Sequence, residues 1–215
     1  MLIIGFAVET HYDASGQVRE TKWQVEKFIG KGGSGRVHVI STSPVEPTLV
    51  DESEPAQEEN KVENREKTGT KGECACKFIR KSTLSKTGLR RLSEEIRVHR
   101  SLSHEHVVKF ISHVEMDGFH AIITELCEHN SMSLMLESRK RLTEPECRYF
   151  LRQVLSALAY LHSRHVIHRD VKLGNIFLSD GPVEDGQRGL VAKLGDFGLA
   201  AQLAYQDERR HSVLG

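Results

Sequence analysis

Residues 168–175 read HRDVKLGN, and the triplet Asp196-Phe197-Gly198 follows twenty-one residues after Asn175. The first segment brings a carboxylate, an ammonium group and a side-chain amide close together in sequence, and the triplet adds a second carboxylate. Between them, residues 191–194 form an apolar run typical of a strand. Phosphoryl transfer asks a protein chiefly for positioning and for stabilisation of charge, which such groups can provide. The two segments therefore predict a site for this chemistry.

Each requirement of that chemistry has a candidate residue. Asp170 is expected to orient a substrate hydroxyl and accept its proton, and Lys172 to stabilise the γ-phosphoryl group as charge develops. Asn175 and Asp196 are expected to hold Mg²⁺ on the phosphates of ATP. Any one such triplet can arise by chance, so the segments upstream decide the interpretation.

A glycine-rich segment, GKGGSGRV, occupies residues 30–37 between two apolar runs. Glycine lets the backbone turn tightly and bring its amides close to phosphate oxygens. A strand after the glycines argues against a Rossmann unit, which needs a helix there, and the absence of G-K-S/T argues against a P-loop. Alone, the segment is also consistent with an ordinary hairpin turn. As a phosphate loop it would use Gly30, Lys31, Gly32, Gly33, Ser34 and Gly35.

Lys77 is a single cation in the apolar, strand-like run 74–79, and Glu95 lies on a predicted helix that follows. The spacing of the helix places Glu95 on the face that packs toward the sheet, where it could pair with Lys77 and hold it against the α- and β-phosphates of ATP. Alternatively, the lysine extends from a strand edge into solvent, or Glu94 or Glu95 is merely solvated. The apolar face expected for this helix comprises Leu89, Leu92, Ile96, His99 and Leu102.

The composition divides the chain into an N-terminal extension at 1–22, a first lobe at 23–128 and a second part at 129–215. In the extension, strands at 6–11 and 18–23 are expected around a turn at 13–16. Residues 44–72 carry eight acidic and four basic residues and no aromatic one, so we expect a disordered insertion in the first lobe.

Further strands are expected at 107–110 and 121–126, which with those upstream give an antiparallel sheet with one helix against it. A second helix is expected to begin at Thr143, where Glu146 can complete a capping box, and to end near Ser163. Its expected buried stripe comprises Phe150, Leu151, Val154, Leu155, Leu158 and Leu161.

Charge and cysteine content limit the function classes. Lysine plus arginine equal aspartate plus glutamate at 30 each, so no overall field favours nucleic acid or an anionic membrane as a partner. The longest apolar run near the start, residues 2–8, is too short to span a membrane. The cysteines include no C-x-x-C pair, and we expect reduced, mostly buried thiols of an intracellular protein at Cys74, Cys76, Cys127 and Cys147.

Together, in this order, these motifs resemble the protein kinases from about Trp23 to Gly215. Lys172, the second residue after the H-R-D triplet, is typical of the serine/threonine branch, since tyrosine kinases usually carry alanine at this position. Within the branch the chain is most similar to polo-like kinases, on the segments EIRVHRSL at 95–102, LTEPE at 142–146, YFLRQ at 149–153 and KLGNIFL at 172–178. The resemblance implies an α+β, two-lobed fold with an antiparallel sheet and one main helix in the first lobe, then an incomplete, mainly helical second lobe.

The resemblance also implies further roles. Glu125, Leu126 and Cys127 match the segment whose backbone binds adenine, and Thr124 matches the residue that limits the pocket behind it. Ser212 matches the activation-loop phosphorylation site, whose phosphate Arg169 could neutralise. Val37, Ala75 and Phe177 would sandwich the adenine ring, and the side chains of His99, His168 and Phe197 would form an internal column.

Three departures from the polo-like pattern accompany this resemblance. Ser34, Gly35 and Val37 replace the phenylalanine, alanine and cysteine that many polo-like kinases carry. The acidic insertion has no counterpart in the usual compact lobe. The chain also ends before the A-P-E motif and the helices that form the floor of the larger lobe.

The resemblance implies an ATP- and Mg²⁺-dependent kinase that phosphorylates Ser/Thr of proteins, in cell-cycle or mitotic control. Its expected location is intracellular, in the cytoplasm, nucleus, centrosome or spindle, with no nucleic-acid or membrane partner and an oligomeric state left open. The alternatives are a truncated product that binds nucleotide or a partner without catalysis, and a small-molecule kinase with a related site.

Overall fold

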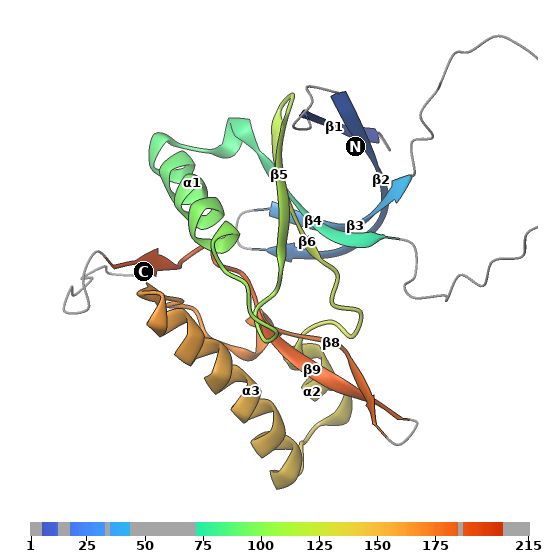
Figure 1. Ribbon diagram of the computed structural model, residues 1–215, viewed down its shortest axis with the longest axis vertical. Helices are drawn as coiled ribbons and strands as arrows, with labels where there is room; N and C mark the ends of the chain where they lie inside the picture. Colours follow the sequence, from blue (N-terminus) through green and yellow to red (C-terminus); the bar gives the residue numbers. More distant parts are fainter. Residues whose placement is uncertain (1–5, 13–17, 33–34, 44–71, 185–186, 204–215) are drawn as a thin grey trace, which may run out of the picture.

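The structure is a computed structural model that describes residues 6–12, 18–32, 35–43, 72–184 and 187–203. A sheet-rich lobe lies above a second lobe built around a long helix, and the two meet at the middle of the molecule (Figure 1). The expected turn at 13–16, Gly33, Ser34, Ser212 and nearly all of the expected insertion at 44–72 lie outside the described residues. This two-lobed α+β arrangement agrees with the predicted fold.

The first lobe contains one antiparallel sheet of six strands in the order β1-β2-β3-β4-β6-β5. Alternation of side chains in β4 places Cys74, Cys76 and Phe78 in a buried cluster with Trp23, while Lys77 faces the opposite side of the sheet. The strands are β1 Phe6–Tyr12, β2 Val18–Gly32, β3 Gly35–Ser43, β4 Glu73–Arg80, β5 Phe110–Met116 and β6 Phe119–Glu125.

The predicted N-terminal hairpin is present, because β1 pairs antiparallel with the first half of β2 from Phe6 opposite Gln24 to Tyr12 opposite Val18. The strand β2 continues without a break across the expected boundary between residues 22 and 23. The hairpin therefore adds an edge strand to the sheet of the first lobe.

Helix α1, Lys86–Arg100, packs beside the sheet (Figure 1) and begins where the side chain of Ser85 accepts a hydrogen bond from Gly88 N. Leu92, Glu95, Val98 and His99 are its buried residues. The prediction for Leu89 was wrong, since its side chain is 42% exposed. Leu89 lies in the first turn of α1, before the stretch from Leu92 to His99 that carries all of the buried residues of the helix. A short 3-10 turn, Lys81–Thr83, precedes the helix.

The second lobe is organised by helix α3, Glu144–Ser163, which begins with the predicted capping box of Thr143 and Glu146. Its buried residues are Phe150, Gln153, Val154, Ala157 and Leu161. Leu151 and Leu155 were wrongly predicted to be buried, since their side chains are 57% and 54% exposed. They lie about 100° further round the helix than Phe150 and Val154, which contact the lobe core.

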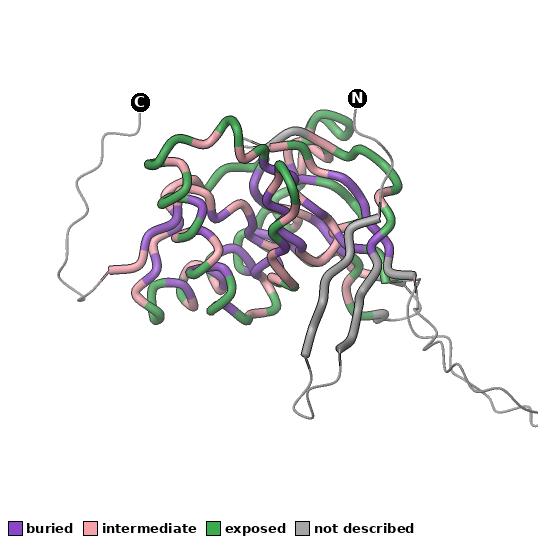
Figure 2. Tube along the Cα trace, turned by 90° about the horizontal axis from the view of Figure 1, so that it is seen from above, coloured by how far each residue is buried: buried purple, intermediate pink, exposed green. Residues whose placement is uncertain are grey.

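The remaining elements of the second lobe surround the site. They are α2 Met132–Arg139, β7 Val166–Ile167, the 3-10 turn Leu173–Asn175, β8 Ile176–Glu184, β9 Gln187–Leu194 and β10 Ala201–Gln202. Strands β8 and β9 form an antiparallel hairpin, and β10 pairs with β7. Seen from above, buried segments run through the interior of the molecule, with exposed segments around them (Figure 2).

The predicted strand at 107–110 was wrong. Val107 makes only an isolated bridge to Leu194, and β5 begins at Phe110. Val107 and Val108 are buried, and the backbone of Val108 donates to Leu194 O at 2.9 Å. The apolar run therefore links β9 to the first lobe instead of extending the sheet.

The four cysteines are free thiols, as predicted. Cys74 and Cys76 are buried and Cys127 is half-buried, in line with the expectation of mostly buried thiols, whereas Cys147 on α3 is exposed. Within the described part of the chain, no helix is long and apolar enough to cross a membrane.

Candidate active site

A cleft of about 360 Å³ lies between the two lobes, within the size range typical of small-molecule sites. Its walls come from the glycine-rich hairpin, β4, α1, β6 and the turn before β8, so residues from distant segments meet there. The lining includes eight residues predicted for nucleotide or metal binding, namely Gly30, Val37, Ala75, Glu125, Cys127, Asn175, Phe177 and Asp196, together with the predicted pair Lys77 and Glu95.

The predicted pair of Lys77 and Glu95 is formed. Lys77 Nζ lies 3.0 Å from Glu95 Oε1 and 3.4 Å from Asp196 Oδ1. Burial alone would lower the pKa of Lys77, but the charges of the Glu95 and Asp196 carboxylates outweigh it and raise that pKa. The ammonium group is therefore charged at neutral pH and faces the cleft.

The second cluster of the site is Asp170, Lys172 and Asn175. Lys172 Nζ lies 2.8 Å from Asp170 Oδ2, and this hydrogen bond is the main cause that lowers the pKa of Asp170. Asn175 Nδ2 donates to Asp170 Oδ2 at 2.8 Å and to Asp170 O at 2.9 Å. With both amide hydrogens engaged, Asn175 Oδ1 is the atom left to act as an acceptor or metal ligand.

Two residues of the site have left-handed backbone conformations, Arg169 with φ 65° and Asp196 with φ 58°. Such conformations are uncommon outside glycine and gather at functional sites. Before Asp196, an added Cβ at Gly195 would lie 2.9 Å from Val108 and Phe177 side-chain atoms. Glycine at this position therefore lets the backbone pass close to Val108 and Phe177 just before Asp196, which lines the cleft.

The predicted column of His99, Phe197 and His168 is present and buried. The Phe197 ring centroid lies 4.5 Å from that of His99 and 5.0 Å from that of His168. Each imidazole donates Nε2–H to a backbone carbonyl, His99 to Val108 O at 2.7 Å and His168 to Gly195 O at 3.0 Å. Burial lowers the pKa of His99 to about 4 and lowers that of His168, so both rings are neutral at pH 7.

The glycine-rich segment forms a hairpin between β2 and β3, with Gly30 opposite Val37, Lys31 opposite Arg36 and Gly32 opposite Gly35. This is the strand–turn–strand context predicted for a phosphate loop, not a helix start. Gly30 and Val37 line the cleft, whereas Gly35 packs against β4, where an added Cβ would clash with the carbonyl oxygen of Phe78.

The side of the cleft predicted for adenine is lined by Thr124, Glu125, Leu126 and Cys127. Burial raises the pKa of the Cys127 thiol to about 12. The predicted sandwich residues Val37, Ala75 and Phe177 line the same cleft.

The sequence interpretation missed part of the lining, notably Asn130, Ser131 and Leu134 at the start of α2. Asn130 has φ 62°, and the side chain of Ser131 caps α2 by accepting from Leu134 N. The Asn-Ser pair before a run of apolar residues was the available helix-start signal.

The expected role of Arg169 toward a phosphate on Ser212 is not tested, because Ser212 lies outside the described residues. Arg169 Nε donates to Leu199 O at 2.6 Å, beside the start of that segment. Arg169 therefore lies near the strand β10 from which the chain continues toward Ser212.

The donor set fits a hard divalent cation together with phosphate oxygens, since Asp196 and Asn175 offer carboxylate and amide oxygens at one wall of the cleft. Among the described residues, no group of three His, Cys, Asp or Glu side chains forms a metal site by itself.

Comparison with known proteins agrees with this geometry. The family model described as "Protein kinase domain" matches residues 59–215. The chain is 44% identical over 142 residues to the Cell cycle serine/threonine-protein kinase CDC5/MSD2 of Saccharomyces cerevisiae, covering 66% of this chain and 19% of that protein. It is 42% identical to the Serine/threonine-protein kinase PLK2 of Mus musculus, covering 66% and 20%.

The alignment with the Serine/threonine-protein kinase PLK1 of Xenopus laevis is longer, at 36% identity over 190 residues, covering 88% of this chain and 26% of that protein. The chain thus spans between about a fifth and a quarter of the length of these relatives. The chain belongs to the protein kinase family, in the serine/threonine branch that includes the polo-like kinases.

Proposed function

We propose that this chain carries the nucleotide-binding and catalytic centre of an ATP-dependent serine/threonine protein kinase. The observation that supports this most strongly is that Lys77, Glu95, Asn175 and Asp196 line one cleft. Just outside this lining, Asn175 holds Asp170, the partner of Lys172, by two hydrogen bonds. A stability role alone does not explain why cations, carboxylates and an amide gather beside an open cavity.

The residues have separate roles in this proposal. Lys77, held by Glu95, binds the α- and β-phosphates, and Asn175 and Asp196 hold Mg²⁺. Asp170 orients the substrate hydroxyl and takes its proton, while Lys172 stabilises charge on the transferred group. When bound, ATP supplies the transferable phosphoryl group and Mg²⁺ neutralises its phosphates.

The glycine-rich segment provides backbone donors from Gly30, Lys31, Gly32, Gly33, Ser34 and Gly35. Val37, Ala75 and Phe177 would sandwich the adenine ring, and the backbone of Glu125 and Cys127 would bind its edge, since all five residues line the cleft. The proposed regulatory site is Ser212, whose phosphate would be neutralised by Arg169.

Protein substrates with Ser or Thr acceptors and an intracellular role in cell-cycle control complete the proposal. The name of the yeast relative, a cell cycle serine/threonine-protein kinase, supports that role. The cytoplasm, nucleus, centrosome and spindle are the proposed locations.

The test compares the chain with its Asp170→Asn variant, using Mg²⁺, radiolabelled ATP and casein. We expect the variant to bind ATP as the parent does but to lose about 10²- to 10⁴-fold in phosphorylation rate, because the proton acceptor is gone. Lys81→Met, which breaks an exposed pair with Glu115 far from the cleft, is the matched control. Failure of the parent chain to bind ATP, or equal rates for parent and Asp170→Asn, would contradict the proposal. Phosphate transfer to a sugar or an aminoglycoside instead of casein would point to a small-molecule kinase.

A further inference from the structure

An ion pair between Glu125 and Lys193 joins the two lobes beside the cleft. Lys193 Nζ lies 2.9 Å from Glu125 Oε1 and 3.1 Å from Oε2. The same carboxylate accepts the backbone N–H of Lys109 at 2.7 Å, and Glu125 N–H donates to Lys109 O at 3.0 Å. Glu125 thus holds groups from two other segments at once.

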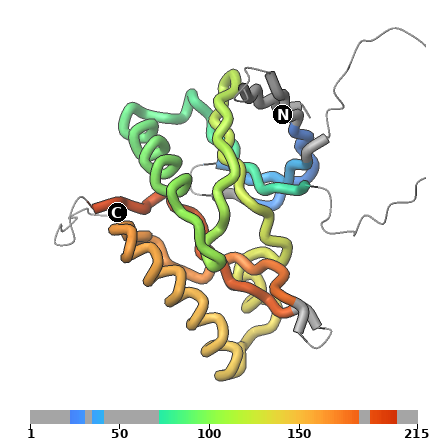
Figure 3. Tube along the Cα trace, viewed as in Figure 1, coloured from blue at the N-terminus to red at the C-terminus, as the bar shows by residue number. Residues whose placement is uncertain are grey.

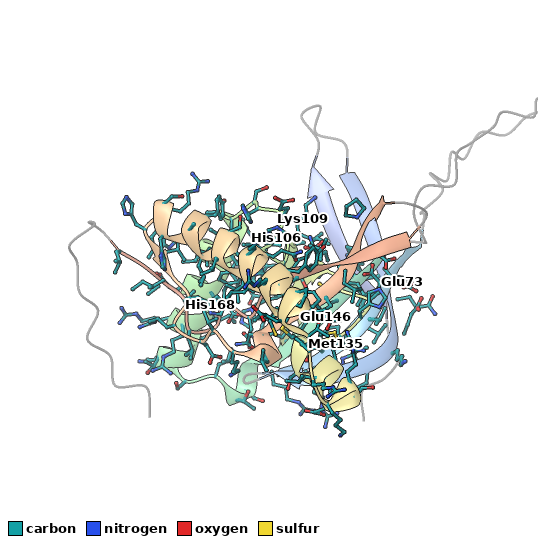
Figure 4. The ribbon with its side chains drawn as sticks, turned by 90° about the horizontal axis from the view of Figure 1, so that it is seen from below. Glu73, His106, Lys109, Met135, Glu146 and His168 are labelled. Atoms are coloured by element: carbon teal, nitrogen blue, oxygen red, sulfur yellow. The ribbon has the colours of Figure 1, made fainter. Side chains whose placement is uncertain are left out.

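The pair is partly shielded from water, with side-chain exposures of 25% for Glu125 and 16% for Lys193. Charge-assisted hydrogen bonds are stronger than neutral ones, and partial burial reduces their screening. The third segment, the connection from α1 to β5, carries His106 and Lys109 close together (Figure 4). Its backbone joins β9 through Leu194 N to His106 O and Val108 N to Leu194 O, both 2.9 Å.

The two partners are each next to groups of the proposed site. Glu125 ends β6 and is followed by Leu126 and Cys127, which line the cleft. Lys193 lies three residues before Asp196 on β9, and its register partner across the hairpin is Phe177, which also lines the cleft. The connection after α1 meets β9 at the middle of the molecule (Figure 3).

We propose that Glu125 and Lys193 form an interlobe clasp that positions the adenine-binding edge of the cleft relative to Phe177 and Asp196. The inference rests on the proposed ATP site and deepens it by naming Lys193 as a positioning residue. The pair links the segment proposed to bind the edge of the base to β9, which pairs with β8 at Phe177 and ends two residues before Asp196. With two donor groups, the Lys193 ammonium and the Lys109 N–H, making three hydrogen bonds to one carboxylate, the edge cannot shift along the cleft without breaking a charged hydrogen bond.

The competing explanation is that the ion pair only stabilises the fold. The preference for ATP over GTP distinguishes this stabilising role from the proposed positioning role. If the pair fixes the position of the adenine-binding segment, the backbone donor and acceptor of that segment match the hydrogen-bonding groups of adenine. They do not match those of guanine, because the two bases carry different groups on the edge that faces the segment. A stability role would change the melting temperature but leave the ratio of GTP to ATP dissociation constants as it is. A positioning role reduces that ratio.

The experiment measures Mg²⁺–ATP and Mg²⁺–GTP dissociation constants by calorimetry on the full chain and on Lys193→Met, Glu125→Gln and the double variant. Glu125→Gln keeps an oxygen for the Lys109 N–H and removes only the charge. Lys81→Met is the control, since it also breaks a Lys–Glu pair, at 2.7 Å, but on the exposed surface of the first lobe.

We expect each single variant to weaken ATP binding about tenfold and to reduce the preference for ATP over GTP, with Lys81→Met unchanged. The double variant is expected to bind about as the singles do, because one interaction is lost in all three. The clasp is overturned if the parent prefers ATP to GTP and both single variants show the same ATP affinity and the same preference. It is also overturned if the loss of ATP affinity in the double variant equals the sum of the losses in the two single variants. Absence of ATP binding by the parent would instead refute the proposed function on which the clasp depends.

Discussion

At the scale of single residues, Glu95 links helix α1 to the cleft. Its carboxylate is buried and lies 3.0 Å from Lys77 Nζ, while the second partner of Lys77, Asp196, is more distant at 3.4 Å. The orientation of the lysine therefore depends on the position of α1, since Asp196 alone would draw the ammonium group toward the metal-binding wall.

Replacing Glu95 by Gln is expected to weaken ATP binding and to lower the free energy of unfolding by about 1–3 kcal/mol. The half-buried ammonium group of Lys77 then loses its nearer charged partner and retains one, Asp196. Urea unfolding and nucleotide titration measure the two effects. Glu94→Gln is the matched control, because Glu94 pairs only on the exposed side with Arg97. Equal stability and affinity of Glu95→Gln and the parent would show that the pair is dispensable.

The buried column predicts how stability depends on pH. The pKa of His99 is about 4 in the folded chain, below the ordinary value of 6.5 that applies when the chain is unfolded, so the unfolded state binds the proton more tightly. Stability is therefore lost as the pH falls from about 6.5 toward 4. Between pH 7 and pH 5, His99 alone is expected to contribute a loss of about 2 kcal/mol, given 1.36 kcal/mol for each unit of difference.

Thermal unfolding of the chain and of His99→Gln at pH 7 and pH 5 tests this dependence. Glutamine can still donate to Val108 O, but it does not titrate. The variant should lose less stability than the parent over this interval, and an identical loss in both would contradict the assignment.

At the scale of elements, the glycine-rich hairpin is held close to β4. An added Cβ at Gly35 would clash with backbone of Phe78, whereas one at Gly30 meets nothing within 4 Å. Gly35→Ala is therefore expected to reduce the free energy of unfolding by about 1–3 kcal/mol and to weaken nucleotide binding, because the hairpin must shift.

Gly30→Ala is the matched comparison for the same measurement by denaturant unfolding. It adds the same methyl group to the same hairpin in open space, so a change within about 0.5 kcal/mol is expected. If both variants unfold alike, the close approach of Gly35 to β4 does not determine the hairpin position.

Elements with a local signal could be predicted from the sequence. The capping box of Thr143 and Glu146 predicted the start of α3, and the apolar run at residues 74–79 predicted β4. The run at 107–110 was misassigned because apolar residues suit both a strand and an interlobe connection, and only the partner Leu194 decides between them. Helix α2 was missed because its eight residues carry no clear apolar face.

At the scale of the whole molecule, the site depends on contacts between distant segments. Lys77 and Asp196 are 119 residues apart in sequence, and Glu125 and Lys193 are 68 apart. The order of motifs predicted the first meeting, because each motif carries its own chemical signature. The second pair has no such signature, since an isolated lysine and glutamate give no sign that they meet.

The chain covers only part of the length of its relatives, so the structure accounts for the nucleotide site and the catalytic carboxylates of the proposal. Recognition of protein substrates is part of the proposed function, and the casein assay tests it. What the two lobes contribute jointly is the cleft, because its lining residues come from both.

The most direct measurement is a crystal structure of the chain with a non-hydrolysable ATP analogue and Mg²⁺. The account predicts that Lys77 contacts the phosphates, that Asn175 and Asp196 bind the metal ion, and that Asp170 faces the terminal phosphate. An analogue bound elsewhere, or a metal ion held without Asn175 and Asp196, would contradict the central claim.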